Sequence, residues 1–164
     1  MNFVSVRAGE TEKIKRLSSL ASRIVKEHYD PILGPVQNDY MIEKFQSVKA
    51  ITSQLDDVYH YWIVTEGEEE LGFIGLYPRE EDLYLSKLYL SKEFRGRGIG
   101  KAMMDFVIDR ARTYGLKKVT LNVNRYNDHS IAFYESYGFK RIREEDNDIG
   151  NGYFMNDYVY EYKC

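Results

Sequence analysis

Three glycines within five residues separate a predicted strand from a long predicted helix. They lie in the stretch Arg95-Gly96-Arg97-Gly98-Ile99-Gly100-Lys101. A turn of this kind lets backbone N–H groups approach a ligand closely, and it points the positive end of the helix dipole at that ligand. The turn therefore predicts binding of a phosphate or a pyrophosphate. The alternative is a glycine-rich turn that only begins a helix.

Two common nucleotide-binding motifs do not fit this turn. A P-loop would require glycine at position 95 and serine or threonine at position 102, where the chain has Arg95 and Ala102. A dinucleotide fingerprint would require glycine at position 101 or 103, depending on its register, and these residues are Lys101 and Met103. The two motifs that would name a nucleotide are thus excluded.

Two segments together resemble the GNAT superfamily of acyl-CoA N-acyltransferases. Arg95-x-x-Gly98-x-Gly100 fits the superfamily signature Q/R-x-x-G-x-G/A, and residues 127–139, NDHSIAFYESYGF, are similar to its segment N-x-x-[A/S]-x-x-[F/L]-Y-E-x-x-G-F. The resemblance implies an acetyl-CoA-dependent N-acetyltransferase, with acetyl-CoA as donor and CoA as product. It also implies direct transfer to a primary amine. Cys164, at the chain end, is a poor candidate for a covalent nucleophile.

The resemblance also implies which residues bind the donor. Backbone groups of Leu88 and Leu90 would bond the pantetheine arm, and one N–H would polarise the thioester oxygen. Backbone N–H groups of residues 97–101 would hold the pyrophosphate. The cofactor-binding set is Leu88, Leu90, Arg95, Gly96, Arg97, Gly98, Ile99, Gly100, Lys101 and Asn127. Two members have structural alternatives, since the Arg95 side chain can point away from the turn and Asn127 can cap the following helix.

Tyr134 matches the superfamily tyrosine that gives a proton to the departing thiolate. A phenol with a pKa of about 10 beside a thiol with a pKa of about 8.5 makes this transfer only modestly uphill. The alternative is an aromatic residue of the core, as most of the 15 tyrosines must be. We assign the catalytic role to Tyr134 and expect Tyr137 to pack.

The attacking amine needs a base, which the sequence does not identify. An alkyl amine with a pKa of about 10.4 is neutral in only about one molecule in 2,000 at pH 7. A carboxylate near the central strands or a side chain after the first helix could collect its proton. The candidates are Glu80, Glu81, Asp82, His28 and Asp30. Each could equally be a solvated surface group.

The acceptor is left open between several classes. The stretch His28-Tyr29-Asp30-Pro31 and the predicted hairpin at 148–158 faintly resemble members that act on polyamines or other small amines. Acidic runs at 66–70, 80–82 and 144–148 could attract a cationic amine, although such runs usually only solvate a surface. A protein N-terminus or a lysine is the alternative acceptor. A non-catalytic acyl-CoA-binding regulatory module is the alternative from another functional class.

Composition excludes several other classes. The single cysteine leaves neither a disulfide nor a cysteine-based zinc site, and the three widely spaced histidines, His28, His60 and His129, argue against a metal site. A net charge of −3 does not favour nucleic-acid binding. No run approaches 18 apolar residues, and the charged N-terminus is unlike a signal peptide. We expect a soluble cytoplasmic protein that binds no membrane, and we leave a homodimer open.

Hydrophobic periodicity predicts alternating strands and helices. The expected strands are 3–7, 58–65, 71–77, 82–90, 117–123, 139–144 and 152–162. The expected helices run from Thr11 to a loop that starts at His28, over 38–55 with a break that could divide it in two, over 98–114, and over 127–137. The resemblance implies one N-acetyltransferase domain over residues 1–164, with an α/β fold. Its mixed central sheet of about six to seven strands is flanked by about four helices. The strands at 83–90 and 119–123 form a splayed central pair.

Overall fold

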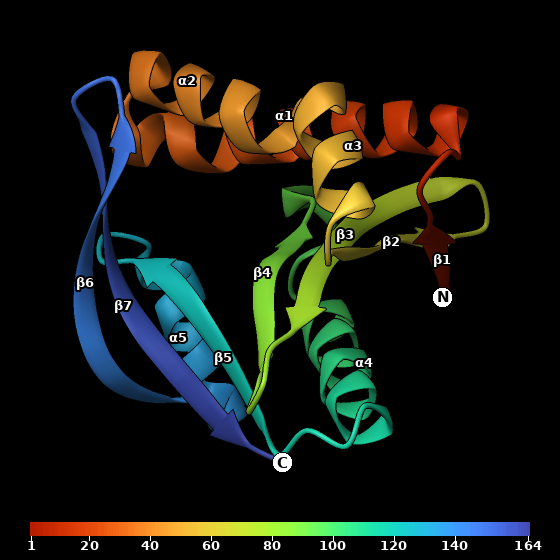
Figure 1. Cartoon of the computed structure of the whole chain (residues 1–164), viewed down its shortest axis with the longest axis vertical. Coiled ribbons are helices and arrows are strands. Elements are labelled where there is room, and N and C mark those ends of the chain that lie inside the picture. The colour runs from red at the N-terminus through yellow and green to blue at the C-terminus, as the bar shows by residue number, and fades with distance from the viewer. The chain divides into compact units, whose positions relative to one another are not determined.

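A computed structural model of the chain describes all residues from 1 to 164 (Figure 1). Its elements are β1 (Asn2–Val6), α1 (Thr11–Leu33), α2 (Pro35–Gln46), α3 (Val48–Asp56), β2 (His60–Glu66), β3 (Glu69–Pro78), β4 (Leu83–Leu90), a 3-10 turn η1 (Lys92–Phe94), α4 (Ile99–Thr113), β5 (Lys118–Asn124), α5 (Asp128–Tyr137), β6 (Lys140–Gly150) and β7 (Tyr153–Lys163). The strands follow the order β1-β2-β3-β4-β5-β7-β6 in one seven-stranded sheet. None of the helices is both long and apolar enough to cross a lipid bilayer.

The sheet is mixed, and this confirms the predicted α/β fold class. β4 and β5 are parallel, with residue pairs from Leu83↔Val119 to Leu85↔Leu121. The pairs β1–β2, β2–β3, β5–β7 and β6–β7 are antiparallel. The splay of β4 from β5 beyond these pairs stays a prediction.

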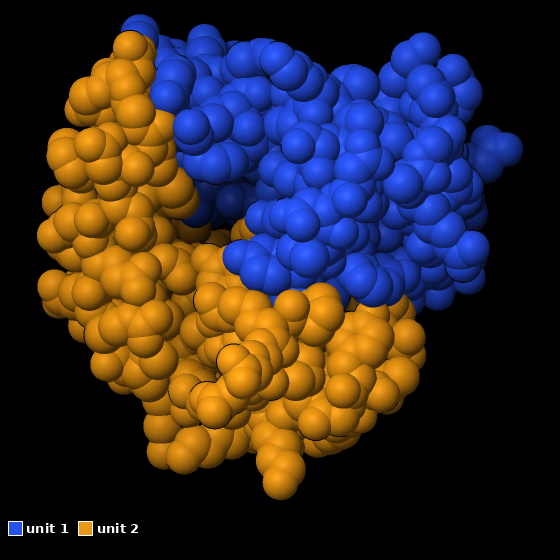
Figure 2. Space-filling view, viewed as in Figure 1, with its two compact units in different colours: residues 1–77, 87–104 blue, residues 78–86, 105–164 orange.

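The chain divides into two compact units, which Figure 2 shows in different colours. Unit 1 comprises residues 1–77 and 87–104, and unit 2 comprises residues 78–86 and 105–164. The boundaries fall at the end of β3, within β4 and within α4. The expectation of one domain over the whole chain remains a prediction.

The core of unit 1 forms between α1 and the strands β1, β2 and β3. Apolar residues of α1 recur three or four positions apart, which places them on one face of the helix. Leu17 and Ile24 on this face are 0% and 1% exposed, and they belong to the same buried cluster as Tyr61 and Phe73. Burial of such side chains contributes roughly 1.5–3 kcal/mol each. In Figure 1, α1 and α2 lie side by side.

The predicted loop from His28 is wrong, because α1 continues to Leu33 with Pro31 inside its last turn. A proline at this position removes one backbone hydrogen bond near the helix end. In the middle of a helix it would interrupt the hydrogen bonds on both sides. The N–H of Gly34 then donates to the Asp30 carbonyl at 3.0 Å, and Gly34 leaves the helix with a φ of 83°. Pro35 opens α2 at a position where proline is favoured.

The predicted division of the next helical stretch is confirmed. α2 ends at Gln46, and α3 begins after Ser47, whose side chain accepts a hydrogen bond from the N–H of Ala50 at 3.1 Å. Serine is a preferred residue at such a helix start, because its oxygen satisfies an N–H that has no helical acceptor. One continuous segment of apolar periodicity therefore becomes two helices.

Unit 2 has two different sheet faces. Side chains alternate along a strand, so Tyr158 and Tyr160 of β7 share one face while Asp157 and Val159 share the other. α5 packs on the tyrosine face, where the Tyr160 hydroxyl donates to Glu135 at 2.6 Å (Figure 1). The opposite face of β5 and β7 carries polar residues at several positions.

Candidate active site

The glycine-rich turn of unit 1 adopts a backbone conformation that depends on its glycines. Gly96 and Gly98 have φ values of 78° and 76°, in the left-handed region that favours glycine. A Cβ at either position would meet no atom within 4 Å, so the turn is open on that side. Hydrogen bonding of α4 begins with the N–H of Ala102 donating to Gly98 at 3.1 Å. The N–H groups of Ile99 and Gly100 therefore have no acceptor inside the helix.

Arg95 points its side chain toward α1. Its Nη2 lies 3.3 Å from Nδ1 of His28. An arginine can only donate, so this contact requires an unprotonated Nδ1. Both residues line a pocket of about 190 Å³ together with Ile24, Glu27 and Lys92. This geometry favours the structural alternative for Arg95, which places the loop against α1.

Leu88 and Leu90 lie on the part of β4 that belongs to unit 1 and are partly buried. The adjacent N–H of Ser91 donates to the carbonyl of Leu71 at 2.8 Å. β3 approaches this end of β4 so closely that a Cβ on Gly72 would overlap the backbone oxygen of Tyr89. The position of the predicted pantetheine strand thus depends on a glycine in the neighbouring strand.

Lys87 of β4 is 5% exposed, although lysine is rarely buried. Its Nζ donates to the carbonyl of Phe45, to Oε1 of Gln46 at 3.0 Å and to Oε1 of Gln54 at 3.3 Å. Burial lowers the pKa of Lys87 to about 7, whereas these three acceptors favour the charged amine. Lys87 thereby ties the α2–α3 corner to β4. The sequence held a signal for this, because lysine interrupts the apolar alternation Leu83, Leu85.

Two further predicted site residues lie in unit 2, at opposite ends of the short helix α5. Asn127 caps the helix, and its Oδ1 accepts a hydrogen bond from the N–H of Ser130 at 3.3 Å. Tyr134 is 9% exposed, and its ring centroid lies 5.8 Å from that of Phe139. Both structural alternatives, the cap and the packed aromatic, are therefore realised. Binding and catalytic roles for these residues remain predictions.

Tyr137 differs chemically from Tyr134. Its hydroxyl donates to Oδ1 of Asp105 at 2.6 Å. Burial and the Asp105 carboxylate raise the pKa of Tyr137 well above its ordinary value. A phenol in this environment gives up its proton less readily than a free one. The ring of Tyr137 lies 6.0 Å from that of Phe139 and 5.4 Å from that of Tyr162, which agrees with the expected packing role.

Two of the carboxylates considered as bases are held in ion pairs. Asp82 accepts two hydrogen bonds from Arg79, each 2.7 Å long, and one from Thr120 at 2.7 Å. These bonds lower the pKa of Asp82 despite partial burial. Hydrogen bonds from Asn38 and Lys26 likewise lower the pKa of Asp30. A carboxylate with a lowered pKa is a weaker base, so both residues fit structural roles better.

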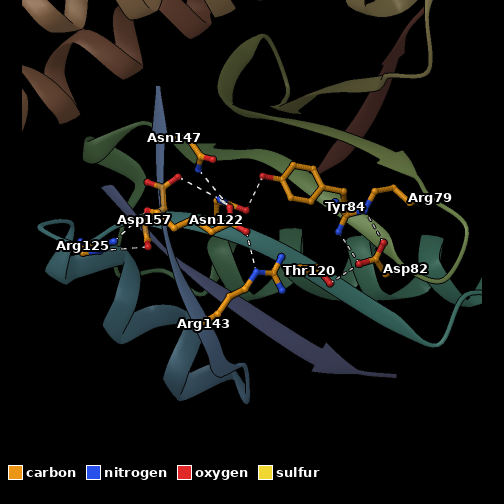
Figure 3. A network of polar contacts seen from close by, with 10 residues as sticks. Arg79, Asp82, Tyr84, Thr120, Asn122, Arg125, Arg143, Asn147 and Asp157 are labelled. Atoms are coloured by element: carbon orange, nitrogen blue, oxygen red, sulfur yellow. Dashed lines mark hydrogen bonds and ion pairs between the residues drawn. The ribbon is translucent and has the colours of Figure 1, made fainter. Parts of the chain in front are cut away.

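A buried acid that the sequence analysis did not single out is Asp157 of β7, which is 2% exposed. Figure 3 shows it within a network of polar side chains from β4, β5 and β6. Asn122 donates to Oδ2 of Asp157 at 3.3 Å and to Glu145 at 3.0 Å, and it accepts from the Tyr84 hydroxyl at 2.9 Å. The available signal was strand alternation, because Asp157 shares a face with Val159, which is fully buried.

The structure thus groups the predicted residues by unit. Unit 1 holds the residues from Leu88 to Lys101 that are predicted to bind the cofactor, and the strand and the turn follow each other directly there. Unit 2 holds Asn127, Tyr134 and the Asp157 network.

Comparisons with known proteins give the same family as the motifs. The model of the Acetyltransferase (GNAT) family matches residues 22–139. Peptidyl-lysine N-acetyltransferase YjaB of Salmonella typhimurium is 26% identical over 160 residues, which are 96% of this chain and 99% of that protein. Human N-acetyltransferase 8 is 32% identical over 87 residues, 49% of this chain and 38% of that protein.

The fold has close counterparts among solved structures. PaiA N-acetyltransferase from Thermoplasma acidophilum, in complex with coenzyme A, has a TM-score of 0.80 over 100% of both chains, at 22% sequence identity. At this identity the likeness shows the fold alone.

Proposed function

The chain belongs to the acetyltransferase (GNAT) family and is an N-acetyltransferase with acetyl-CoA as its acyl donor, and we propose that its acceptor is the ε-amine of lysine in a peptide or protein. The observation that carries this choice is the likeness to YjaB, which extends over nearly all of both chains. The alternative of a non-catalytic module is set aside, because the relatives are named as N-acetyltransferases.

The proposed donor site is the glycine-rich turn and the adjoining end of β4. The N–H groups of Ile99 and Gly100 would donate to the pyrophosphate, and the N-terminal end of α4 would favour its negative charge. Backbone groups of Leu88 and Leu90 would bond the pantetheine arm, and one of their N–H groups would stabilise the oxyanion formed at the thioester carbonyl. The open space around Gly96 and Gly98 supports this assignment.

The proposed acid is Tyr134, which would give its phenolic proton to the CoA thiolate as the carbon–sulfur bond breaks. Its neighbour Tyr137 is a poorer donor, because its hydroxyl is bonded to Asp105. Asn127 would contact the donor while it caps α5. No covalent enzyme intermediate is part of this proposal.

A small polyamine is the second candidate acceptor. β6 carries four carboxylates in five residues, at Glu144, Glu145, Asp146 and Asp148, and three of them are exposed. Arg125 and Arg143 pair with part of this charge. A polyamine carries several positive charges, so such a surface would attract it more strongly than a single amine.

The expected cytoplasmic location and a homodimer stay predictions.

A panel of acceptors tests the proposed substrate. Release of CoA thiol would be measured with a lysine peptide, with spermidine and with an aryl amine, at saturating acetyl-CoA and several salt concentrations. We expect the highest kcat/KM for the lysine peptide. If kcat/KM is highest for spermidine and falls steeply with salt, the acceptor is the polyamine and the lysine proposal is wrong.

A further inference from the structure

Strand register places a set of polar side chains on one face of the unit 2 sheet. Asn124 of β5 lies opposite Asp157 of β7, and Asp157 lies opposite Glu145 of β6. Residues directly opposite each other project to the same face, and so do residues two positions apart. Asn122 therefore shares this face with Asn124, as its bonds to Asp157 and Glu145 confirm. α5 lies on the other face.

Asp157 is the least compensated charge in this set. Its Oδ2 accepts one hydrogen bond, from Asn122, while Oδ1 is buried without any hydrogen-bond partner. No lysine or arginine forms an ion pair with it. A carboxylate that is 98% buried normally has a cation or several donors, because charge is costly to remove from water. Oδ1 therefore points to a missing positively charged or donating partner.

The nearby arginines do not supply that partner. Arg125, which follows β5, donates to the backbone oxygens of Asp157 and Glu145 at 3.4 and 3.1 Å and to the Asp146 carboxylate at 2.8 Å. Arg143 of β6 donates to Oε2 of Glu145 at 2.8 Å. Both guanidinium groups thus hold the hairpin and its outer carboxylates. Neither guanidinium group forms an ion pair with the Asp157 carboxylate, so its partner would come from outside the chain.

Burial and two neighbouring carboxylates prepare Asp157 to accept a proton. Burial raises the pKa of Asp157 above its ordinary value of 3.8, and the carboxylates of Glu145 and Asp146 raise it further. The Asn122 hydrogen bond and Arg125 act in the opposite direction. From β4, the Tyr84 hydroxyl faces the same asparagine, to which it donates. A base with a raised pKa holds a transferred proton better than an ordinary aspartate does.

We infer that the Asp157 carboxylate, oriented by Asn122 and flanked by Glu145, is the site that receives the acceptor's primary ammonium group and takes its first proton. This inference rests on the proposed transfer to a primary amine and adds the residue that prepares that amine. An ammonium group is compact and carries three donors, so it can satisfy Oδ1 and a second carboxylate together. Glu145, whose side chain is 30% exposed, presents the outer carboxylate of this pair.

The proton balance follows from this assignment. The protonated amine R–NH₃⁺ gives one proton to Oδ1 of Asp157, which later releases it to solvent, and the neutral amine attacks the thioester carbonyl carbon. The carbon–nitrogen bond forms and the carbon–sulfur bond breaks. The thiolate takes the Tyr134 proton, the second proton lost from nitrogen passes to solvent, and Tyr134 takes a proton back from solvent. The sum is an amide, CoA thiol and one proton in solution.

Oδ1 is enclosed in the free chain, so the acceptor must displace a neighbouring side chain to reach it. Glu145 is a partly exposed neighbour, and its rotation, which would release its hydrogen bonds with Asn122 and Arg143, would open the carboxylate pair to a cation. Charge on the approaching amine favours this step, because Glu145 and Asp157 are both acidic. A neutral acceptor of the same shape would gain nothing from it.

Asp157→Asn tests the inference, because it keeps the shape and the Asn122 contact while removing the charge. With the lysine peptide at saturating acetyl-CoA, kcat/KM should fall by roughly 100-fold or more, as for the loss of a general base. Tm should stay equal or rise, because a buried unpaired charge has been removed. Asp109→Asn, at an exposed aspartate of α4, is the matched control and should retain wild-type kinetics.

The pH dependence of kcat/KM distinguishes a catalytic base at Asp157 from a residue that only stabilises the fold. Wild-type kcat/KM should show an ionisation of Asp157 in its acid limb, and the variant should lose that limb and keep only the amine ionisation. Activity within threefold of wild type in Asp157→Asn would overturn the assignment while the acetyltransferase proposal stands. A lower Tm with an unchanged pH profile would also overturn it. If wild-type protein acetylates no primary amine of the panel, the proposed acceptor class and this inference both fall.

Discussion

Gly98→Asp should weaken CoA binding by about two orders of magnitude without preventing folding. Gly98 has a φ of 76°, and a Cβ there meets no atom within 4 Å. An aspartate therefore fits sterically, although a side chain in the left-handed region costs roughly 1–2 kcal/mol. That cost applies equally to the free and the CoA-bound protein. The loss of affinity would thus come from charge.

The size of the charge effect follows from Coulomb's law. A carboxylate about 6 Å from one pyrophosphate charge, at an effective dielectric constant of about 20, is repelled by about 3 kcal/mol. This repulsion corresponds to roughly a 100-fold increase in Kd. Gly98→Ala adds the same Cβ without the charge and is the matched control. Its Kd should remain close to that of the wild type.

Thermal unfolding with and without CoA measures this difference. At a CoA concentration of about 100 times the wild-type Kd, binding stabilises the wild type by about 2.7 kcal/mol. For a chain of this length the stabilisation raises Tm by roughly 5–10 °C. The gain for Gly98→Asp at the same concentration should be about 0.4 kcal/mol, or roughly 1 °C. Equal shifts for wild type and Gly98→Asp would show that the turn does not hold the pyrophosphate.

Three other substitutions test separate parts of the structure. Tyr134→Phe should lower kcat by roughly 10- to 1,000-fold with little change in acetyl-CoA affinity. Unchanged turnover, under conditions where the chemical step limits the rate, would show that Tyr134 has only a packing role. Gly72→Ala should lower stability by about 1–3 kcal/mol, because its Cβ overlaps the oxygen of Tyr89; an unchanged Tm would contradict the close strand approach. Asp82→Asn should cost about 1–3 kcal/mol at neutral pH. Since ion pairing lowers the pKa of Asp82, this difference should vanish as pH falls below 3.8 toward the lowered value, and a difference that persists in acid would rule out the ion pair as its source.

Local patterns were sufficient for most of the fold. The helix after the glycine-rich turn begins at Ile99 and ends before Gly115, which has a φ of 72°, as its apolar stripe and its glycine predicted. The end of α1 could not be predicted in the same way. A proline breaks a helix in the middle but is tolerated in a last turn, and the apolar spacing does not distinguish these cases. In the structure Tyr29 of this last part of α1 is 8% exposed and belongs to the buried cluster.

The part of the candidate site that depends on backbone conformation, the glycine-rich turn, could be predicted from the sequence. Glycine spacing identified the turn at Gly96 and Gly98, because few other residues adopt its conformation. The acid–base groups were less accessible to sequence analysis. Asp82 and Asp157 are both aspartates on or beside strands, and only the structure shows that Arg79 neutralises the first while the second is buried without a cation. Burial and pairing arise from tertiary contacts that sequence spacing does not encode.

Transfer of the acetyl group to a lysine ε-amine can be followed by quantifying both products. Wild-type protein is incubated with acetyl-CoA and a peptide that contains one lysine and a blocked N-terminus, and both products are quantified over time. We expect equal amounts of CoA thiol and of peptide carrying one acetyl group on the lysine ε-amine. Thiol release without acetylated peptide, or no release at all, would contradict transfer to this amine.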